Sequence, residues 1–448
     1  SSKKTNKNDN LGKNYKMLTD IEHVLHAPDT YIGAVEEDRV KGWILDNDSK
    51  MKYTNYNWIA GLYKCFDEGI VNARDHAIRL IEKINKRTKN IVPVKGIDIS
   101  VDKETGVITM LNDGNGIDIE KHPEHKIWIP EMIFGHLRTS TNYEKNEEKI
   151  VGGKNGFGFK LVLIYSKWGE IETVDHIRGK KYKQRFENNL SVINKPKISS
   201  CKSKPYTKVS WLPDYERFGI HNITEDMFNL MKKRTFDIAA VTSKNVKVRF
   251  NNEVVPVKSF ENYVDSFIGN KTETKRVYEN SHKRWEYVAC LSPVDEFTQV
   301  SFVNGINTGK GGKHVEYILN QITKKIINYI QKKKKITVKA VTIKEQLMLF
   351  INCTIVNPET IPDLAESPSH NIKIHLSDLV VPAQLASINF GMPLIFLLLR
   401  PSVFFAALLS FNSFKFIADS ITPIFANLSM KPFDTSHLLP NFDTGIFI

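Results

Sequence analysis

The feature that most constrains the fold is a glycine-rich segment at residues 151–160, Val-Gly-Gly-Lys-Asn-Gly-Phe-Gly-Phe-Lys, which runs directly into the apolar residues 161–164. Glycine has no side chain, so backbone N–H groups in such a loop can face a ligand closely. A helix that begins at the loop adds unpaired N–H donors and partial positive charge, which together favour an anion. Lys160 would bring a full charge to the same place. The alternative is a glycine-rich turn before a buried helix, and this segment alone leaves both interpretations open.

A second segment, residues 65–76, has the apolar spacing of an amphipathic helix. Glu68, Asn72 and Asp75 stand at positions i, i+4 and i+7, so they share one face of that helix. A carboxylate and an amide one turn apart can orient a water molecule and hold a hard cation through oxygen. The same pattern also fits an ordinary solvated face of an amphipathic helix.

A third segment, Asn-Asp-Gly-Asn-Gly at residues 112–116, follows the apolar residues 107–111, which we interpret as a buried strand. Taken alone, the five residues predict a loop. A short polar side chain at the end of a buried strand, here Asn112, can also lie at the floor of a ligand pocket, where it can contact the edge of a base.

These three motifs, in this order, resemble the superfamily of gyrase, heat-shock chaperone, histidine kinase and MutL ATPases. Further segments are similar to the ATPase region of eukaryotic-type, including viral, DNA topoisomerase II. They read Leu-His-Ala-Pro-Asp-Thr-Tyr-Ile-Gly at 25–33, Arg-Thr-Ser-Thr-Asn-Tyr at 138–143, Phe-Val-Asn-Gly-Ile-Asn-Thr at 302–308 and Gly-Gly-Lys-His-Val at 311–315. The resemblance covers residues 14–358.

The resemblance implies a role for each matching residue. Glu68 matches the general base, and Asn72 matches the residue that holds Mg²⁺ against the phosphates of ATP. Lys160 matches the lysine near the γ-phosphate, and Asn112 matches the contact to adenine. The remaining candidate ATP-binding residues are Asp75, His76, Ser140, Thr141, Asn142, Gly153, Lys154, Asn155, Gly156, Phe157 and Gly158. His76 stands where the family often has asparagine.

The resemblance also implies the architecture. We expect an α+β fold in which a two-layer α/β sandwich is followed by a partial transducer domain similar to ribosomal protein S5. The predicted parts are a disordered basic arm (1–14), an ATP-binding domain (15–262), a truncated transducer domain (263–358) and a tail without family resemblance (359–448). Predicted strands are 95–101, 106–111, 171–176, 208–212, 246–250, 285–291 and 298–303, and predicted helices are 58–84, 160–166 and 314–332.

The charge of the chain indicates an anionic partner. Its net charge is +13, yet residues 359–448 contain only four basic and seven acidic residues, so the positive excess lies before them. Nucleic acid is the better candidate and membrane lipid the lesser one. Lys332, Lys333, Lys334 and Lys335 follow the predicted helix 314–332. Such a run is commonly a solvated helix end, but the resemblance implies a loop that faces captured double-stranded DNA.

Beyond residue 358 the family pattern should continue to a Gln-Thr-Lys segment, whose lysine reaches the γ-phosphate, but no such tripeptide follows. We interpret 359–448 as an artefactual or disordered tail. Its apolar stretch 390–411 is interrupted by Arg400 and Pro401, which argues against a membrane span. The four cysteines lack metal-type spacing and favour a reducing compartment. The resemblance implies the nucleus, or a viral factory or the cytoplasm for a viral protein.

We therefore expect an ATP- and Mg²⁺-dependent gate that forms a homodimer around DNA and cannot cleave DNA by itself. A nucleotide-dependent DNA clamp with little hydrolysis is the first alternative, because the Gln-Thr-Lys lysine is missing. The second alternative is a heat-shock-type chaperone or a mismatch-repair ATPase. The segments at 138–143 and 302–308 argue against each of these two protein classes.

Overall fold

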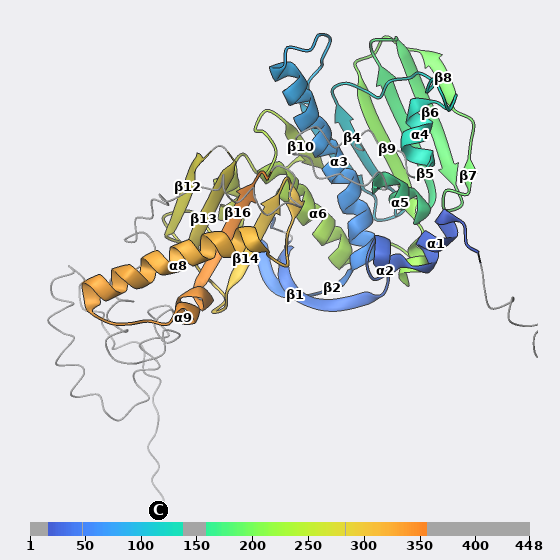
Figure 1. Ribbon diagram of the computed structural model, residues 1–448. Coiled ribbons are helices and arrows are strands. Elements are labelled where there is room, and N and C mark those ends of the chain that lie inside the picture. The colour runs from blue at the N-terminus through green and yellow to red at the C-terminus, as the bar shows by residue number, and fades with distance from the viewer. Residues whose placement is uncertain (1–16, 47, 138–157, 283, 356–448) are drawn as a thin grey trace, which may run out of the picture. The chain divides into compact units, whose positions relative to one another are not determined.

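A computed structural model describes residues 17–46, 48–137, 158–282 and 284–355, and all of these lie within one compact unit, Ser1–Leu379. The described part is an α+β protein with two main sheets, each accompanied by helices (Figure 1). This agrees with the predicted fold class. The predicted arm (1–14) and tail (359–448) lie outside the described residues, and the proposed domain boundaries remain predictions.

The larger sheet forms from strands whose side chains alternate between buried and solvated positions, as in β6, so one face is available for packing. Neighbouring strands are antiparallel except β10 and β3, which are parallel. Its path runs β11 (Glu253–Val254), β10 (Lys247–Phe250), β3 (Gly96–Val101), β4 (Ile108–Asp113), β9 (Tyr206–Pro213), β5 (Ser166–Asp175), β6 (Lys180–Glu187) and β7 (Val192–Ile193), with β8 (Lys197–Ser200) also paired to β6.

Helices α3 (Ala60–Asn85), α5 (Gly158–Ile164) and α6 (Glu225–Ala240) cover this sheet. The apolar side of α3 packs on β4 and β9. At this contact, Met110 of β4 and Trp211 of β9 lie directly beneath Gly69. The ring of Phe159 on α5 meets Trp211 edge-on at 5.4 Å. The shorter helices are α1 (Asp20–His26), α2 (Pro28–Tyr31), α4 (Ile129–Gly135) and the 3₁₀ helix η3 (Tyr215–Phe218).

A long hairpin precedes α3. Strands β1 (Glu37–Leu45) and β2 (Met51–Ile59) pair antiparallel in continuous register along their whole length, and they pack against α6. Neither strand was predicted, because polar residues separate their apolar residues except at 43–45 and 58–59. Trp58 and Ile59, predicted as the start of a helix, complete β2 instead.

The second sheet has the order β12 (Arg276–His282), β13 (Trp285–Leu291), β16 (Leu347–Cys353), β14 (Thr298–Val303) and β15 (Ile306–Asn307), in which β14 and β16 are parallel. Its helices are α7 (Phe260–Ile268), α8 (Lys313–Lys334) and α9 (Ala340–Glu345). α8 begins and ends within two residues of the predicted helix, and its aliphatic residues are buried except Ile327, which is half-buried.

Other predicted boundaries also differ from the structure. Helix α5 ends at Ile164 rather than Ser166, which begins β5 and donates its hydroxyl to the carbonyl of Val162 at 2.5 Å. The lysine run does not follow α8. Lys332, Lys333 and Lys334 form its last turn and Lys335 is its C-cap, because lysine favours helices and a positive charge is stabilised near a helix C-terminus.

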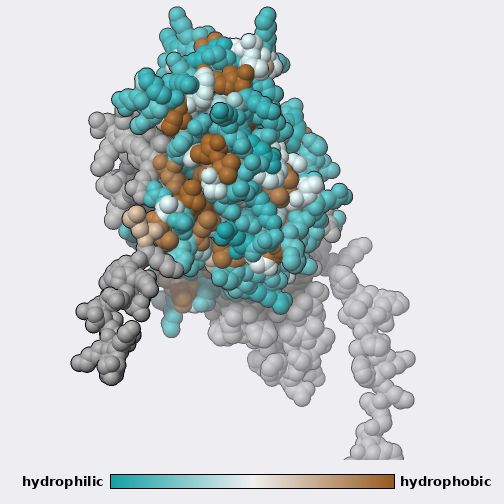
Figure 2. All heavy atoms as spheres, turned by 90° about the vertical axis from the view of Figure 1, so that its right-hand side faces the viewer, coloured by the Kyte–Doolittle hydropathy of each residue, from teal (hydrophilic) through white to brown (hydrophobic). Residues whose placement is uncertain are grey.

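Figure 2 shows the face that lies on the right-hand side of Figure 1. This face is mainly hydrophilic, with apolar patches between polar residues. Among the described residues, exposed large apolar side chains include Ile177 and Val254, each 57% exposed. Among the described residues, no helix combines the length and apolarity needed to cross a bilayer.

Candidate nucleotide site

Glu68 and Asn72, one turn apart on α3, converge on Gly158, the first residue of α5. The Oε2 atom of Glu68 lies 3.0 Å, and the Nδ2 atom of Asn72 3.7 Å, from the point where a Cβ atom at residue 158 would stand. A side chain at this position would crowd the carboxylate, so glycine allows α3 and α5 to approach. The structure thereby brings Gly158 next to two residues of α3 that precede it by 90 and 86 positions in the sequence.

The carboxylate of Glu68 is held in place from one side. Lys64, one turn earlier on α3, places its Nζ 2.6 Å from Oε1 of Glu68. The Glu68 side chain keeps 20% exposure, and its second oxygen, Oε2, has no part in this ion pair. The Lys64–Glu68 spacing of four residues is a common helical ion pair, and the sequence could have shown it.

Asp75 and His76 lie deeper in the same helix. Asp75 is 1% exposed and stands 3.5 Å from Nη1 of Arg74. Burial lowers the pKa of His76 to about 4, so its ring is neutral at pH 7, and its Nε2–H donates to the carbonyl of Asn115 at 2.7 Å. His76 therefore binds the loop after β4, and only its other ring nitrogen is left for a nucleotide.

Asn112 lies at the end of β4, as predicted, and is 8% exposed. Its Nδ2 donates to the carbonyl of Asp113 at 3.0 Å. Asp113 in turn accepts the backbone N–H groups of Lys95 and Gly96 at 2.6 and 2.8 Å. These bonds fix the backbone of β4 where the sequence predicts a pocket floor.

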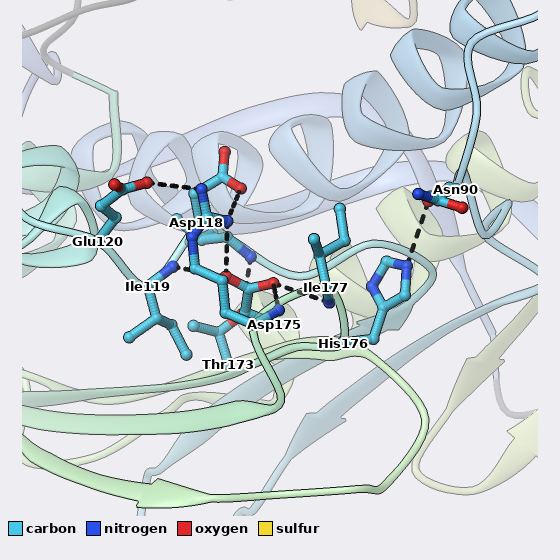
Figure 3. Close-up of polar contacts among 10 residues, drawn as sticks. Asn90, Asp118, Ile119, Glu120, Thr173, Asp175, His176 and Ile177 are labelled. Carbon is cyan, nitrogen blue, oxygen red and sulfur yellow. Dashed lines mark hydrogen bonds and ion pairs between the residues drawn. The ribbon is translucent and has the colours of Figure 1, made fainter.

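The residues that follow the Asn-Asp-Gly-Asn-Gly motif (112–116) are held at the end of β5 by a cluster of charged side chains (Figure 3). The sequence did not predict this cluster. Arg178 donates Nη1 to Asp118 at 2.7 Å and to Asp175 at 2.9 Å, and Nη2 to Glu120 at 2.6 Å. Asp175 also accepts the N–H of Ile119 at 3.0 Å. Burial opposes its ionisation, but these hydrogen bonds outweigh that effect and keep the pKa of Asp175 below its ordinary value.

Lys160 lies in the first turn of α5 and is 3% exposed. Burial lowers the pKa of Lys160 to about 8, because removing an ammonium group from water disfavours its charged form. Such a buried cation gains from an added negative charge. The other predicted phosphate and ribose contacts, Ser140, Thr141, Asn142, Gly153, Lys154, Asn155, Gly156 and Phe157, lie outside the described residues.

The lysine run lies on the second sheet's helix rather than at this site. The side chains of Lys332, Lys333 and Lys335 are exposed, and Lys335 adopts a left-handed conformation with φ 61°. A shallow groove of about 180 Å³ lies between α8 and α9, lined in part by Lys324 and Lys344. This end of α8 therefore presents a solvated positive face.

Comparison with known proteins agrees with this arrangement. A family model described as DNA gyrase B matches residues 257–360. DNA topoisomerase 2 of Acanthamoeba polyphaga mimivirus is 43% identical over 366 residues, which cover 80% of this chain and 28% of the relative. DNA topoisomerase 2 of Saccharomyces cerevisiae is 39% identical over 389 residues, covering 83% and 26%. The chain thus spans about a quarter of the length of these curated relatives.

A solved structure of the ATPase region of Saccharomyces cerevisiae topoisomerase II superposes with a TM-score of 0.70 at 37% identity, covering 86% of this chain and 98% of that one. A second structure, the ATPase and transducer domains of DNA topoisomerase II from Balamuthia mandrillaris, gives a TM-score of 0.69 at 38% identity, covering 77% and 86%. The order of the motifs, the site on α3 and α5 and these likenesses lead to one conclusion: the chain belongs to the DNA topoisomerase II family and corresponds to its ATPase region.

Proposed function

We propose that the chain binds ATP with Mg²⁺ and hydrolyses it, as the ATP-dependent gate of a type II DNA topoisomerase. The observation that carries the proposal is the convergence of Glu68 and Asn72 on Gly158. Phosphoryl transfer depends on positioning and on neutralising charge more than on covalent chemistry of the protein. A carboxylate and an amide beside a position without a side chain, and a buried lysine two residues further along α5, supply the groups that this needs.

Glu68 is the proposed general base. Its Oε1 is held by Lys64 at 2.6 Å, which leaves Oε2 to accept a proton from the attacking water. Lys160 is proposed to face the γ-phosphate, where its charge offsets the negative charge of the transferred group. Asn112, Asp75 and His76 are proposed contacts on the adenine side, with the eight phosphate and ribose residues outside the described part completing the site.

The residues present fit a Mg²⁺ ion that is held mainly by phosphate. Asn72 offers one neutral amide oxygen, and the nearby carboxylate of Glu68 is already paired with Lys64. Mg²⁺ typically keeps several waters and takes few protein ligands when it accompanies a nucleotide. When bound, it would neutralise charge on the phosphates, and Asn72 would orient it.

We further propose double-stranded DNA and a second copy of the chain as partners. Support comes from the exposed lysines at the end of α8, whose attraction for phosphate would not depend on DNA sequence. The relatives are eukaryotic and viral topoisomerases. We accordingly propose the nucleus, or a viral factory or the cytoplasm, as the location. The ATP-driven dimer would close around a DNA segment.

One observation favours a second candidate function. The sequence after Pro358 reads Glu-Thr-Ile-Pro-Asp and contains no Gln-Thr-Lys. Without that lysine, one cation fewer neutralises the negative charge that develops on the γ-phosphate during hydrolysis. ATP binding would therefore be preserved better than ATP hydrolysis. The chain would then act as a nucleotide-dependent DNA clamp.

Phosphate release and bound nucleotide, measured together on the full chain at saturating Mg·ATP, separate the two candidates. A gate turns over with nearly full occupancy, and Glu68→Gln abolishes turnover while occupancy persists. Full occupancy with negligible turnover supports the clamp. Absence of bound nucleotide would contradict both functions.

A further inference from the structure

Two buried arginines connect the helix that carries Glu68 and Asn72 to a tight turn of the second sheet. The turn comprises Asn304 and Gly305, between β14 and β15. Arg74 of α3 donates Nη1 to the carbonyl of Asn304 at 2.8 Å and Nε to the carbonyl of Val241 at 3.1 Å. Arg234 of α6 donates Nη2 to the carbonyl of Gly305 at 2.8 Å.

Arg234 also reaches α3 itself. Its Nε donates to Oδ1 of Asp67 at 2.5 Å, and Asp67 directly precedes Glu68. Its guanidinium group lies 6.0 Å from the ring centroid of Phe302 on β14. One side chain of α6 therefore contacts α3 and two parts of the second sheet.

These charges are buried, which makes their partners important. Arg74 is 5% exposed, Arg234 0% and Asp67 8%. Burial by itself would lower the pKa of Arg234, but the carboxylates of Asp67 and Asp237 outweigh it and raise that pKa above its ordinary value. A buried charge without its partner is costly, so the two arginines and the turn are held to one arrangement.

The turn is shaped to fit Arg74. Gly305 has φ +79°, a conformation that side chains disfavour, and a Cβ atom there would stand 2.4 to 2.5 Å from the guanidinium atoms of Arg74. Alanine at this position would therefore displace either the turn or Arg74. Close contact of this kind transmits movement because packed groups cannot be compressed.

The same turn holds the end of strand β16. The Nδ2 of Asn304 donates to the carbonyl of Ile355 at 2.8 Å, and the N–H of Ile355 donates to Oδ1 of Asn304 at 2.9 Å. The N–H of Asn304 also donates to the carbonyl of Cys353 at 2.9 Å. A shift of the chain where it leaves β16 would therefore move Asn304, whose carbonyl binds Arg74.

We propose that Arg74 and Arg234 are positioning residues that carry displacements of the Asn304–Gly305 turn to α3 and so set the alignment of Glu68 and Asn72. Arg74 is two residues beyond Asn72, and Asp67 is next to Glu68, so the two contacts bracket the site on one rigid helix. The expected effect on catalysis rests on the proposed hydrolysis. The mechanical part, in which the turn displaces α3, does not depend on hydrolysis.

The catalytic part is tested with Arg74→Met, which keeps the aliphatic stem and removes the guanidinium group. Misplacing reacting groups by about 1 Å can cost roughly 10²-fold in rate, and we expect kcat to fall by about tenfold or more. The affinity for a non-hydrolysable ATP analogue should stay within about twofold. The matched control is Arg276→Met. Arg276 lies on β12 of the second sheet, is 1% exposed and pairs with Asp265 of α7 at 2.8 Å. Equal decreases of kcat in both variants would overturn the proposal.

The mechanical part is tested without nucleotide, by hydrogen exchange of peptides covering residues 66–76. Gly305→Ala should accelerate exchange there, and this acceleration should disappear when Gly305→Ala is combined with Arg74→Met, which removes the clash. Unchanged exchange in Gly305→Ala, or the same acceleration in both backgrounds, would contradict the proposal. A wild-type chain without turnover would refute the proposed hydrolysis, while the exchange result would still decide whether the turn acts on α3.

Discussion

Helices α3 and α8 resemble each other in length and amphipathic character but differ in what surrounds their polar residues. α3 has 26 residues and α8 has 22, and each packs an apolar side against its own sheet. α3 buries Asp67, Arg74 and Asp75, whereas the lysines at the end of α8 are solvated. The partners of a charged residue, more than its identity, decide whether it has a fixed position.

This difference leads to two kinds of function. A buried charge with a partner at a set distance can orient a reacting group, and its removal has a large, specific effect. Solvated charges are screened by counterions, so each lysine of the run contributes little to DNA affinity. The effect is shared among all members of the run. We therefore expect changes on α3 to alter turnover, and changes at the end of α8 to alter DNA affinity.

The largest expected effect comes from Glu68→Gln. The amide keeps the shape of the side chain but cannot accept the proton of water, and a positioned base is typically worth ~10²–10⁴-fold. We expect turnover to fall by that factor while ATP remains bound. Glu82→Gln, the same change further along α3, serves as the control, and unchanged turnover in Glu68→Gln would remove Glu68 from the role of base.

Asn72→Ala should weaken nucleotide binding by about 10- to 100-fold in the presence of Mg²⁺, since a hydrogen bond or ligand contact to a charged group is worth ~1.5–3 kcal/mol. Without Mg²⁺ the decrease should be small, because the amide is proposed to act through the ion. Calorimetric titration with and without Mg²⁺ measures both values. Equal decreases under the two conditions would refute the metal-related role.

Nucleotide affinity should depend on pH through Lys160. The pKa of Lys160 is about 8 in the free protein, and bound phosphate should raise it. Above pH 8 binding must therefore take up a proton, and affinity should fall by up to about tenfold per pH unit. Titrations in buffers of different ionisation enthalpy measure this uptake, and Lys160→Met should abolish it. Uptake that persists in the variant would assign the effect to another group.

Replacing Lys332, Lys333, Lys334 and Lys335 with alanine should lower DNA affinity and flatten its salt dependence. Removing one lysine–phosphate interaction reduces the log–log slope by about 0.9. The matched control removes four exposed basic residues at and just beyond the C-terminal end of α3, namely Lys83, Lys86, Arg87 and Lys89. An equal change of slope in the two variants would reduce the lysine run to general surface charge.

A smaller effect concerns acid stability, because each helix holds one histidine that is buried or half-buried. Burial lowers the pKa of His76 on α3 and of His314 on α8 to about 4. Below pH 6.5 the unfolded chain binds protons that these folded rings do not, so stability falls as the pH drops toward 4. Each histidine should cost about 1.4 kcal/mol at pH 5.5. Denaturant unfolding at pH 7.5 and 5.5 tests this, and His314→Gln should lessen the difference.

The sequence predicted those parts of the site that depend on local spacing. The shared face of Glu68 and Asn72 follows from helical periodicity, and the position of Asn112 follows from an apolar strand that ends in a turn. The network of Arg74, Arg234 and Asn304 could not be predicted, because its members are about 70 to 230 residues apart and nothing local indicates that the arginines are buried.

The sharpest test of a hydrolytic centre at Glu68 and Asn72 is an experimental structure of the chain with Mg²⁺ and a non-hydrolysable ATP analogue. We expect an oxygen of Asn72 about 2.1 Å from the ion, with Glu68 facing the γ-phosphate across one water. We also expect Nζ of Lys160 within hydrogen-bond distance of that phosphate. A nucleotide bound away from Gly158, or an ion without Asn72 among its ligands, would refute this assignment of the site.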